Sequence, residues 1–278
     1  MSSALSVYHG PFGRVALYNL DRPMITHAHR EGHLTFYVSG PESIMPVKEM
    51  PNILNPETAV ACSPWEPHSF QPGRLDTPSL FLVLYIKPVW FLEIARNAQP
   101  GLRFGRTHLY RTAKIEGYVR KITNLLLLND ETDVFDGYLY ELTQECYDQS
   151  WKQAEIAGNP YAHASITDFR IRRSVKLMKE RLCQPTELDK IATESGLSRP
   201  HFYKLFRQET GITPNLFLNT LKIEHALTEL SRPEPMVTNI ADDLGFSSQA
   251  SFTRFFTSNV GLAPSVYRRV ANFDRAWD

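Results

Sequence analysis

Residues 191–214 read IATESGLSRPHFYKLFRQETGITP, and residues 240–264 read IADDLGFSSQASFTRFFTSNVGLAP. The pattern Ile-Ala-x-x-x-Gly-x-Ser recurs at an offset of 49 residues, and the phenylalanines, glycine and proline that follow it recur at an offset of 50. A glycine allows the positive φ of a tight turn, and a serine caps a following helix. Each stretch therefore predicts a short helix, a turn at Gly196 or Gly245, and a second helix capped by Ser198 or Ser247. Two such units in one chain favour a double helix-turn-helix over a plain helical bundle.

The second helix of each unit has an apolar side and a polar side. Phe202 and Phe206, or Phe252 and Phe256, pack on the first helix of the unit and leave donors outward. Arginine and lysine read guanine, glutamine reads adenine, and the remaining donors bind phosphates. The predicted DNA-binding residues are Arg199, His201, Tyr203, Lys204, Arg207, Ser248, Gln249, Ser251 and Arg254.

Over about Thr167–Arg269 the chain resembles the DNA-binding domain of the arabinose-regulator (AraC) family of bacterial transcription factors. The most specific stretch is Ile240-Ala241-x-x-x-Gly245-Phe246-Ser247-Ser248-Gln249-Ala250-Ser251-Phe252-x-Arg254-x-Phe256, followed by Gly261-Leu262-Ala263-Pro264-x-x-Tyr267-Arg268. The resemblance implies that a long helix, about Pro214–Leu230, joins the two units. It places base contacts on Tyr203, Lys204, Gln249 and Arg254, and phosphate or edge contacts on Arg199, His201 and Ser248. Two small departures are Ala263, where a capping serine is usual, and Pro200, at a position that can contact bases.

The N-terminal half predicts a β domain followed by helices. Short β-rich runs cover Val15–Leu20, His33–Val38, Thr58–Ala61 and Leu80–Ile86. Apolar residues then recur at helical spacing over residues 113–128 and 134–156, and the amphipathic stripes of these helices predict a homodimer contact. Gly158, Asn159 and Pro160 indicate a linker. We therefore expect an α+β chain with a cupin-like effector and dimerisation domain at 1–156, a linker at 157–163 and an all-α double helix-turn-helix domain at 164–278.

Four histidines form a pattern that resembles a cupin barrel: His27-x-His29-x-x-x-His33, with Gly40 further on, then Pro64-Trp65-Glu66-Pro67-His68. Cupin enzymes hold a metal with a His-x-His pair, a glutamate and a distant histidine. Here His33 stands in place of the glutamate and Trp65 in place of the glycine. Residues two apart on a strand face the same side, so His27, His29 and His33 share a face if the strand stays regular. The alternatives are pocket or core residues without a metal, and a transition-metal site at His27, His29, His33 and His68.

The resemblance also extends to the arabinose-sensing barrel. Its sugar-contacting positions fall approximately on Phe70, Phe81 and Val83, so a stacking indole is absent and a less polar effector is favoured. A polar end of that effector would meet His27, His68 or Arg14. The predicted ligand-binding residues are Arg14, His27, His29, His33, Trp65, His68, Phe70, Phe81 and Val83.

Charge, cysteine spacing and the first residues indicate the partner and the location of the protein. The net charge of zero hides a charge of −3 in residues 1–162 and +3 in residues 163–278, which weakly favours nucleic acid as a partner of the second half. Cys62, Cys146 and Cys183 lack CxxC spacing, and the first twenty residues lack a signal-peptide pattern, which indicates a cytoplasmic protein.

We therefore expect a DNA-binding transcription regulator that senses a small molecule, is no enzyme and requires no cofactor. Double-stranded DNA, an effector, a second copy of the chain and RNA polymerase are its expected partners, with no membrane. The alternatives are a metal-dependent cupin enzyme or metal sensor with a helical accessory domain, and a constitutive architectural DNA-binding protein.

Overall fold

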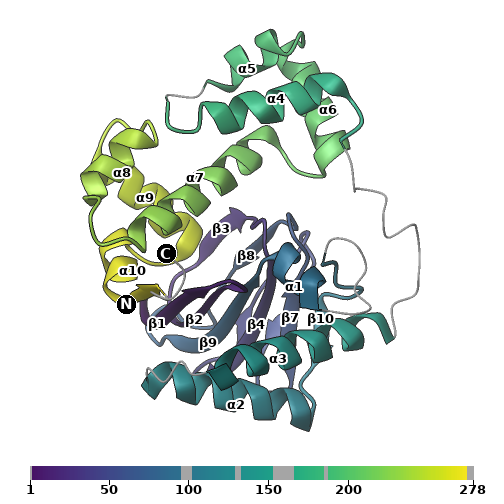
Figure 1. Ribbon diagram of the computed structural model, residues 1–278, viewed down its shortest axis with the longest axis vertical. Coiled ribbons are helices and arrows are strands. Elements are labelled where there is room, and N and C mark those ends of the chain that lie inside the picture. The colour runs from purple at the N-terminus through teal and green to yellow at the C-terminus, as the bar shows by residue number, and fades with distance from the viewer. Residues whose placement is uncertain (1, 95–101, 129–132, 153–165, 185–186, 274–278) are drawn as a thin grey trace. The chain divides into compact units, whose positions relative to one another are not determined.

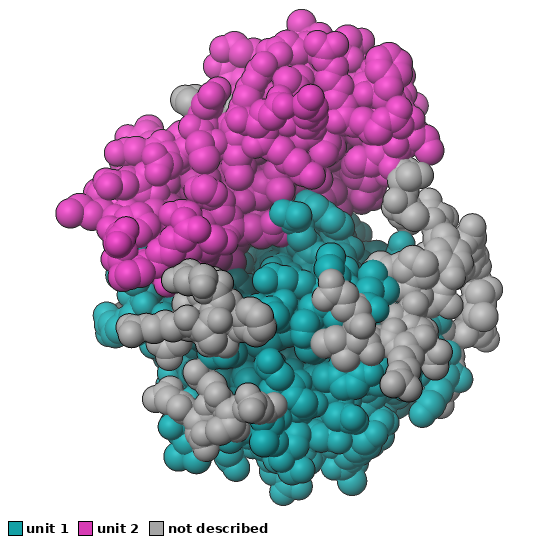
Figure 2. All heavy atoms as spheres, in the orientation of Figure 1, with its two compact units in different colours: residues 1–156, 257–278 teal, residues 157–256 magenta. Residues whose placement is uncertain are grey.

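The computed structural model describes residues 2–94, 102–128, 133–152, 166–184 and 187–273. They divide into two compact units (Figure 2), residues 1–156 with 257–278 and residues 157–256. The expected α+β class is confirmed, because strands dominate the first hundred residues and helices follow. The predicted linker at 157–163 lies outside the described residues. The predicted domains, which follow the sequence repeat, divide the chain differently from the compact units and remain a prediction.

The strands of the first unit form one large sheet and two small ones (Figure 1). They are β1 (Ser3–Gly10), β2 (Gly13–Leu20), β3 (Met24–His27), β4 (Gly32–Ser39), β5 (Ser43–Ile44), β6 (Ile53–Leu54), β7 (Thr58–Cys62), β8 (His68–Phe70), β9 (Ser79–Ile86), β10 (His108–Tyr110) and β11 (Ala271–Phe273). The large sheet has the order β10-β7-β4-β9-β2-β1-β11, and β3 pairs with β8 and β5 with β6. Neighbours are antiparallel except β1 and β11, which are parallel.

Two faces of the large sheet have different partners. One face, the helix face, carries Leu17, Leu34, Phe36, Leu82 and Leu84, all buried in one apolar core with the helices that follow the β domain. The opposite face, the inner face, carries Arg14, His33 and Tyr85, because side chains alternate along each strand. Rings of β8 lie against this inner face: His68 against His33 and Phe70 against Phe81.

The helices of the first unit are α1 (Pro88–Ile94), α2 (Ala113–Leu128), α3 (Asp133–Lys152) and α10 (Pro264–Val270). The bounds predicted for α2 are confirmed, and the end predicted for α3, residues 153–156, lies outside the described residues. Leu126 and Leu139 are each 1% exposed in the core of the helix face. These two side chains are therefore used inside one protomer, and the dimer contact predicted for the two helices stays a prediction.

The second unit holds α4 (Phe169–Glu180), α5 (Leu188–Glu194), α6 (Arg199–Thr210), α7 (Pro214–Leu230), α8 (Val237–Asp243) and most of α9 (Gln249–Val260). The bounds predicted for α7 are confirmed. The Thr213 hydroxyl accepts the Leu216 N–H at 3.2 Å, and Pro214 starts the helix, so both N-terminal signals are used. Figure 1 shows α7 running between the α4–α6 group and α8 with α9.

Candidate functional site

The first helix-turn-helix unit consists of α5, a turn of four residues (195–198) and α6. Gly196 has φ +75°, as the predicted turn requires, and the Leu197 N–H donates to the Ala192 carbonyl at 2.9 Å. Phe202 and Phe206 are fully buried, which confirms the predicted apolar side of α6. Ser198 stands at the N-cap but its side chain makes no capping hydrogen bond, so that part of the prediction is wrong.

The second unit repeats this geometry in α8 and α9. Gly245 has φ +71°, and the Phe246 N–H donates to the Ala241 carbonyl at 2.9 Å, the same bond as in the first unit. The capping hydroxyl is that of Ser248, which accepts the Ser251 N–H at 3.2 Å, and not that of Ser247 as predicted. The reason is that the second turn is one residue longer, which is the residue gained between the two repeats.

A lysine of the connecting helix holds the second turn in place. The Lys222 ammonium donates to the Leu244 carbonyl at 2.7 Å and lies 4.9 Å from the centroid of the Phe246 ring. Burial lowers the pKa of Lys222 below its ordinary value. Sequence reasoning missed this residue, because a lysine on a helix gives no signal that it reaches a carbonyl 22 residues away.

Most predicted DNA-binding side chains are exposed on α6 and at the start of α9. Arg199, His201, Lys204, Arg207, Ser248, Gln249 and Arg254 are exposed, whereas Tyr203 and Ser251 are half-buried. Arg199 forms an ion pair with Asp189 at 2.9 Å, and the Tyr203 hydroxyl donates to the Asn215 amide oxygen at 3.4 Å. The Arg254 guanidinium donates to the Ser251 hydroxyl at 3.3 Å.

A hollow beside α6 adds two residues to this surface. Tyr203, Lys204 and Arg207 line it together with Gln208 and Thr213, which sequence reasoning missed. Gln208 lies four residues after Lys204, so the helical period already placed it on the same side of α6.

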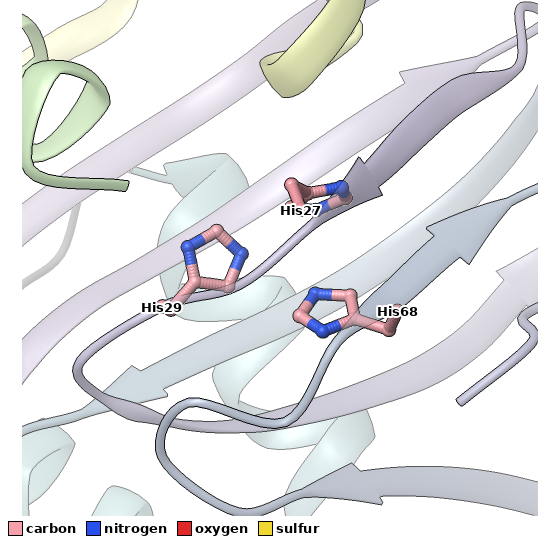
Figure 3. Close-up of side chains that lie close together, drawn as sticks. All are labelled: His27, His29 and His68. Carbon is pink, nitrogen blue, oxygen red and sulfur yellow. The ribbon is translucent and has the colours of Figure 1, made fainter. Parts of the chain in front are cut away.

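The four predicted histidines converge in the first unit, over the inner face of the sheet. His27, His29 and His68 each offer a ring nitrogen, and these atoms lie within 4.8 Å of one another (Figure 3). His33 and Cys62 form a second such group with His68. The expected strand alternation explains only part of the convergence. The strand β3 ends at His27 and His29 lies in the connection to β4, so the placement of both histidines on one strand is wrong and the condition of a regular strand up to His33 is not met.

Backbone carbonyls fix the orientation of two of these rings. His27 Nδ1 lies 2.8 Å from the Ile25 carbonyl, and His68 Nδ1 lies 2.8 Å from the Glu66 carbonyl. A ring nitrogen beside a carbonyl is the N–H donor, so the Nε2 atom of each neutral ring carries the lone pair. His33 Nδ1 then donates to His68 Nε2 at 3.3 Å, and His33 Nε2 accepts the Thr35 hydroxyl at 2.9 Å.

His29 is the member of the cluster with an unsatisfied nitrogen. Its Nε2 atom is buried without a hydrogen-bond partner among the described residues. Burial lowers the pKa of His29, His33 and His68 well below the ordinary value, and that of His27 to about 4, with neighbouring histidines adding to the shift for the first three. All four rings are therefore neutral near pH 7.

Trp65 occupies a backbone position suited to glycine. Its φ is +65°, in the left-handed region, and its N–H donates to the His29 carbonyl at 2.7 Å. The cupin pattern has a glycine at this position, and a glycine adopts this positive φ more easily than a tryptophan does. Trp65 supports the segment that carries His29, while contact of its indole with a ligand stays a prediction.

The remaining predicted ligand residues, Arg14, Phe70, Phe81 and Val83, are all buried on or against the inner face. Sequence reasoning missed Tyr18 and Tyr85, which share this face. The signal was available, since Tyr85 is two residues after Val83 on the same predicted strand and Tyr18 is four residues after Arg14.

Comparison with known proteins agrees with this geometry. Residues 191–270 match the model of a family described as a helix-turn-helix domain. The MmsAB operon regulatory protein of Pseudomonas aeruginosa is 34% identical over 92 residues, which are 33% of this chain and 30% of that protein. A Staphylococcus aureus protein described as an uncharacterized HTH-type transcriptional regulator is 32% identical over 103 residues, 37% of this chain and 14% of that protein. The matches thus span less than a third of these relatives' length.

Two solved structures share the fold over nearly the whole chain. ToxT from Vibrio cholerae O395 has a TM-score of 0.55 at 13% identity, covering 98% of this chain and 97% of that chain. A wild-type ToxT described as unsaturated fatty acid bound, from strain SCE256, has a TM-score of 0.54 at 13% identity, covering 98% and 95%. Residues 191–270 are a helix-turn-helix domain, and the whole chain has the fold of ToxT.

Proposed function

We propose that this protein is a transcription regulator that binds specific DNA through α6 and α9 and senses a small molecule in its β domain. The observation that carries the proposal is the repeated helix-turn-helix geometry, with the same turn bond in both units and donors exposed on both second helices. In the part of the chain that the structure describes, no helix has the length and apolar character to cross a membrane. We place the regulator in the cytoplasm, as a homodimer that meets RNA polymerase at its target promoters.

From the exposed hydrogen-bond donors we infer which side chains contact DNA bases. Arg254 and Gln249 are both exposed on α9, and Lys204, the counterpart of Arg254 in the sequence repeat, is exposed on α6. Arginine and lysine give bidentate or direct contacts to guanine, and glutamine to adenine. Two recognition helices in successive major-groove segments lie about 34 Å apart, so each half-site would span roughly two turns.

Titration of a fluorescent duplex tests this assignment. The duplexes are fragments from beside the gene of the protein and random DNA of equal length. Arg254→Ala should weaken specific binding by about 1–3 kcal/mol and random binding less, and Lys204→Ala should do the same. Arg232→Ala, which changes an arginine that is 61% exposed and paired with Glu229, is the control. Equal losses on both duplexes would reassign Arg254 to phosphate, and unchanged binding would remove α9 from the interface.

Sensing requires that the effector bind one arrangement of the protein better than another. The buried inner face, with its histidines and Arg14, is the site that we assign to the effector. The ToxT structure with a bound fatty acid supports the idea that this fold holds a small molecule. We expect no catalytic turnover, because binding and release of the effector suffice for regulation.

The histidine cluster favours a second candidate, a transition-metal site made of His27, His29 and His68. Neutral imidazoles bind zinc, copper, nickel or ferrous iron, and metal-binding histidines usually anchor their other nitrogen on a carbonyl, as His27 and His68 do. His29 Nε2 has no other partner among the described residues. The group with Cys62 fits less well, because burial raises the pKa of the Cys62 thiol and disfavours the thiolate that binds metal.

Elemental analysis after dialysis tests the metal site. A metal sensor or a metal-dependent enzyme should retain stoichiometric metal, His29→Ala should lose it, and His9→Ala, which changes a histidine outside the cluster, should keep it. Turnover that depends on the metal would favour the enzyme. If the wild-type protein held no metal after incubation with each of the four metals and dialysis, the metal site would be excluded. The histidine cluster would then be assigned to effector binding.

A further inference from the structure

One row of paired residues crosses five strands of the large sheet on the inner face. His9 pairs with Arg14, Arg14 with Tyr85, Tyr85 with His33, and His33 with Cys62, from β1 through β2, β9 and β4 to β7. Side chains paired directly across strands point to the same face. The row is buried from Arg14 to Cys62 and half-buried at His9, and it contains a permanent positive charge, that of Arg14, since a guanidinium stays protonated in proteins.

Arg14 has no anionic partner among the residues that the structure describes. The residue is 6% exposed, its Cζ lies 3.7 Å from the centroid of the Tyr85 ring, and its Nε has no hydrogen-bond partner. Its guanidinium hydrogen-bonds to the phenols of Tyr85 and Tyr267, and burial raises the pKa of both phenols and that of Tyr18, so all three phenols near it are neutral. Glu31 acts on Arg14 electrostatically without an ion pair to it. A buried charge is stable only when an opposite charge or several hydrogen bonds compensate its lost hydration.

The next rows on the inner face change from polar to apolar. Two residues further along the strands lie Ala16, Val83 and Thr35, whose side chains are short. Four residues along lie Tyr18 and Phe81, and the Phe70 ring from β8 meets Phe81 edge-on at 5.4 Å between centroids. Four residues of strand span roughly 13 Å. The inner face thus has a cationic end, a floor of small side chains and an aromatic end.

We propose that this face binds a small organic carboxylate, with its charged group on Arg14 and its apolar body directed toward Phe70 and Phe81. His29 Nε2 and the Tyr18 hydroxyl, both buried without hydrogen-bond partners among the described residues, are the further polar groups that such a ligand meets. The inference deepens the proposed sensing function, on which it rests, by naming the chemical class of the effector. A bare divalent cation at the histidines would be repelled by Arg14, whereas a carboxylate compensates this charge.

A stability measurement separates a ligand-binding arginine from a structural one. Arg111 is the matched control, because its side chain is also buried, at 5% exposure, but donates to the Tyr37 carbonyl and pairs with Glu116. Without ligand, Arg14→Met should leave the melting temperature equal or higher, since it removes a buried charge that only neutral phenols and a ring face compensate, whereas Arg111→Met should lower it. If Arg14→Met lowered the melting temperature as much as Arg111→Met, Arg14 would be a structural residue and the proposal would be overturned.

Calorimetric titration of the full-length protein tests the ligand class. The probes are octanoate and 4-phenylbutanoate, each compared with its neutral amide, which has nearly the same shape. At least one acid should bind more than tenfold tighter than its amide, and Arg14→Met should abolish this preference. Arg22→Met, which changes an arginine whose side chain is 56% exposed, should keep it. Equal binding of acid and amide, unchanged binding by Arg14→Met, or no binding of either acid at millimolar concentration would overturn the proposal.

DNA titration of the same samples distinguishes this failure from failure of the proposed function. Specific DNA binding without carboxylate binding refutes the effector class and leaves the regulator intact. Carboxylate binding that depends on Arg14, without specific DNA binding, keeps the site and refutes the regulator.

Discussion

His9 shows how a single side chain ties stability to pH. Its Nε2 lies 2.8 Å from the Tyr267 hydroxyl, and its ring meets the Tyr267 ring edge-on. Burial, together with the positive charges of Arg14 and Lys87, lowers the pKa of His9 from 6.5 to about 3. The folded protein therefore keeps this ring neutral over a range in which the unfolded chain takes up a proton.

Replacing His9 should make the protein less sensitive to acid. Because the pKa is lower in the folded state, the contribution of His9 to stability is complete above pH 6.5 and falls as the pH drops from 6.5 toward 3. In His9→Gln the free energy of unfolding should decline less steeply in this window, by at most about 1.4 kcal/mol per pH unit. Urea titrations in EDTA at several pH values measure the slope. His201→Gln, an exposed histidine, should keep the wild-type slope, and an equal slope in both variants would contradict the role of His9.

Among the elements, the N-termini of α6 and α7 can be compared directly. Both helices begin with a hydroxyl residue followed within two positions by proline, but only the Thr213 hydroxyl accepts a backbone N–H. Thr213→Ala should therefore destabilise the protein by about 1 kcal/mol, and Ser198→Ala should cost much less. Chemical denaturation of the two variants checks the difference. A larger loss for Ser198→Ala would show that its hydroxyl bonds in solution as the sequence pattern predicts.

The strands that the sequence predicts are the central ones. Four predicted runs correspond to β2, β4, β7 and β9, which are buried on both sides and therefore read as continuous apolar segments. The strands β3 and β8 are not among the predicted β-rich runs, because they are short and carry His27, His68 and Ser69 instead of an apolar run. These two strands nevertheless bring the site residues over the inner face. Because the residues that form the site are polar, the hydropathy pattern does not predict the strands that carry them.

The sequence predicts the residues of the candidate site better than it predicts their geometry. The His-x-His spacing and the distant His68 predicted a convergence that the structure shows. The route of the chain after His27 was not predictable, because it depends on where β3 ends and on the positive φ of Trp65. That Arg14 has no anionic partner among the described residues depends on which side chains surround it, and no local pattern contains that information. The repeated helix-turn-helix was predictable in nearly full detail because its turns and buried positions are fixed by local spacing.

For the molecule as a whole, the surface of α2 and α3 is the candidate contact between two copies of the chain. The inward stripe of these helices is used in the core, but Leu127, Leu128 and Val134, near the ends of the two helices, are 52%, 73% and 52% exposed. Exposed apolar residues in a group are typical of a contact surface. A symmetric dimer would use the same patch from both copies.

Leu128→Glu should therefore convert a homodimer into monomers and weaken binding to a full DNA site, because only a dimer places two readers on adjacent half-sites. Sedimentation velocity measures the mass, and duplex titration measures the affinity on a full site and on a half-site. Leu75→Glu is the matched control, since Leu75 is also 73% exposed but lies in the β domain, before β9. Binding to a half-site should stay unchanged in both variants, which separates lost dimerisation from lost folding. If Leu128→Glu and wild type had the same mass and the same affinity for the full site, this patch would have no part in assembly and a dimer would require another surface.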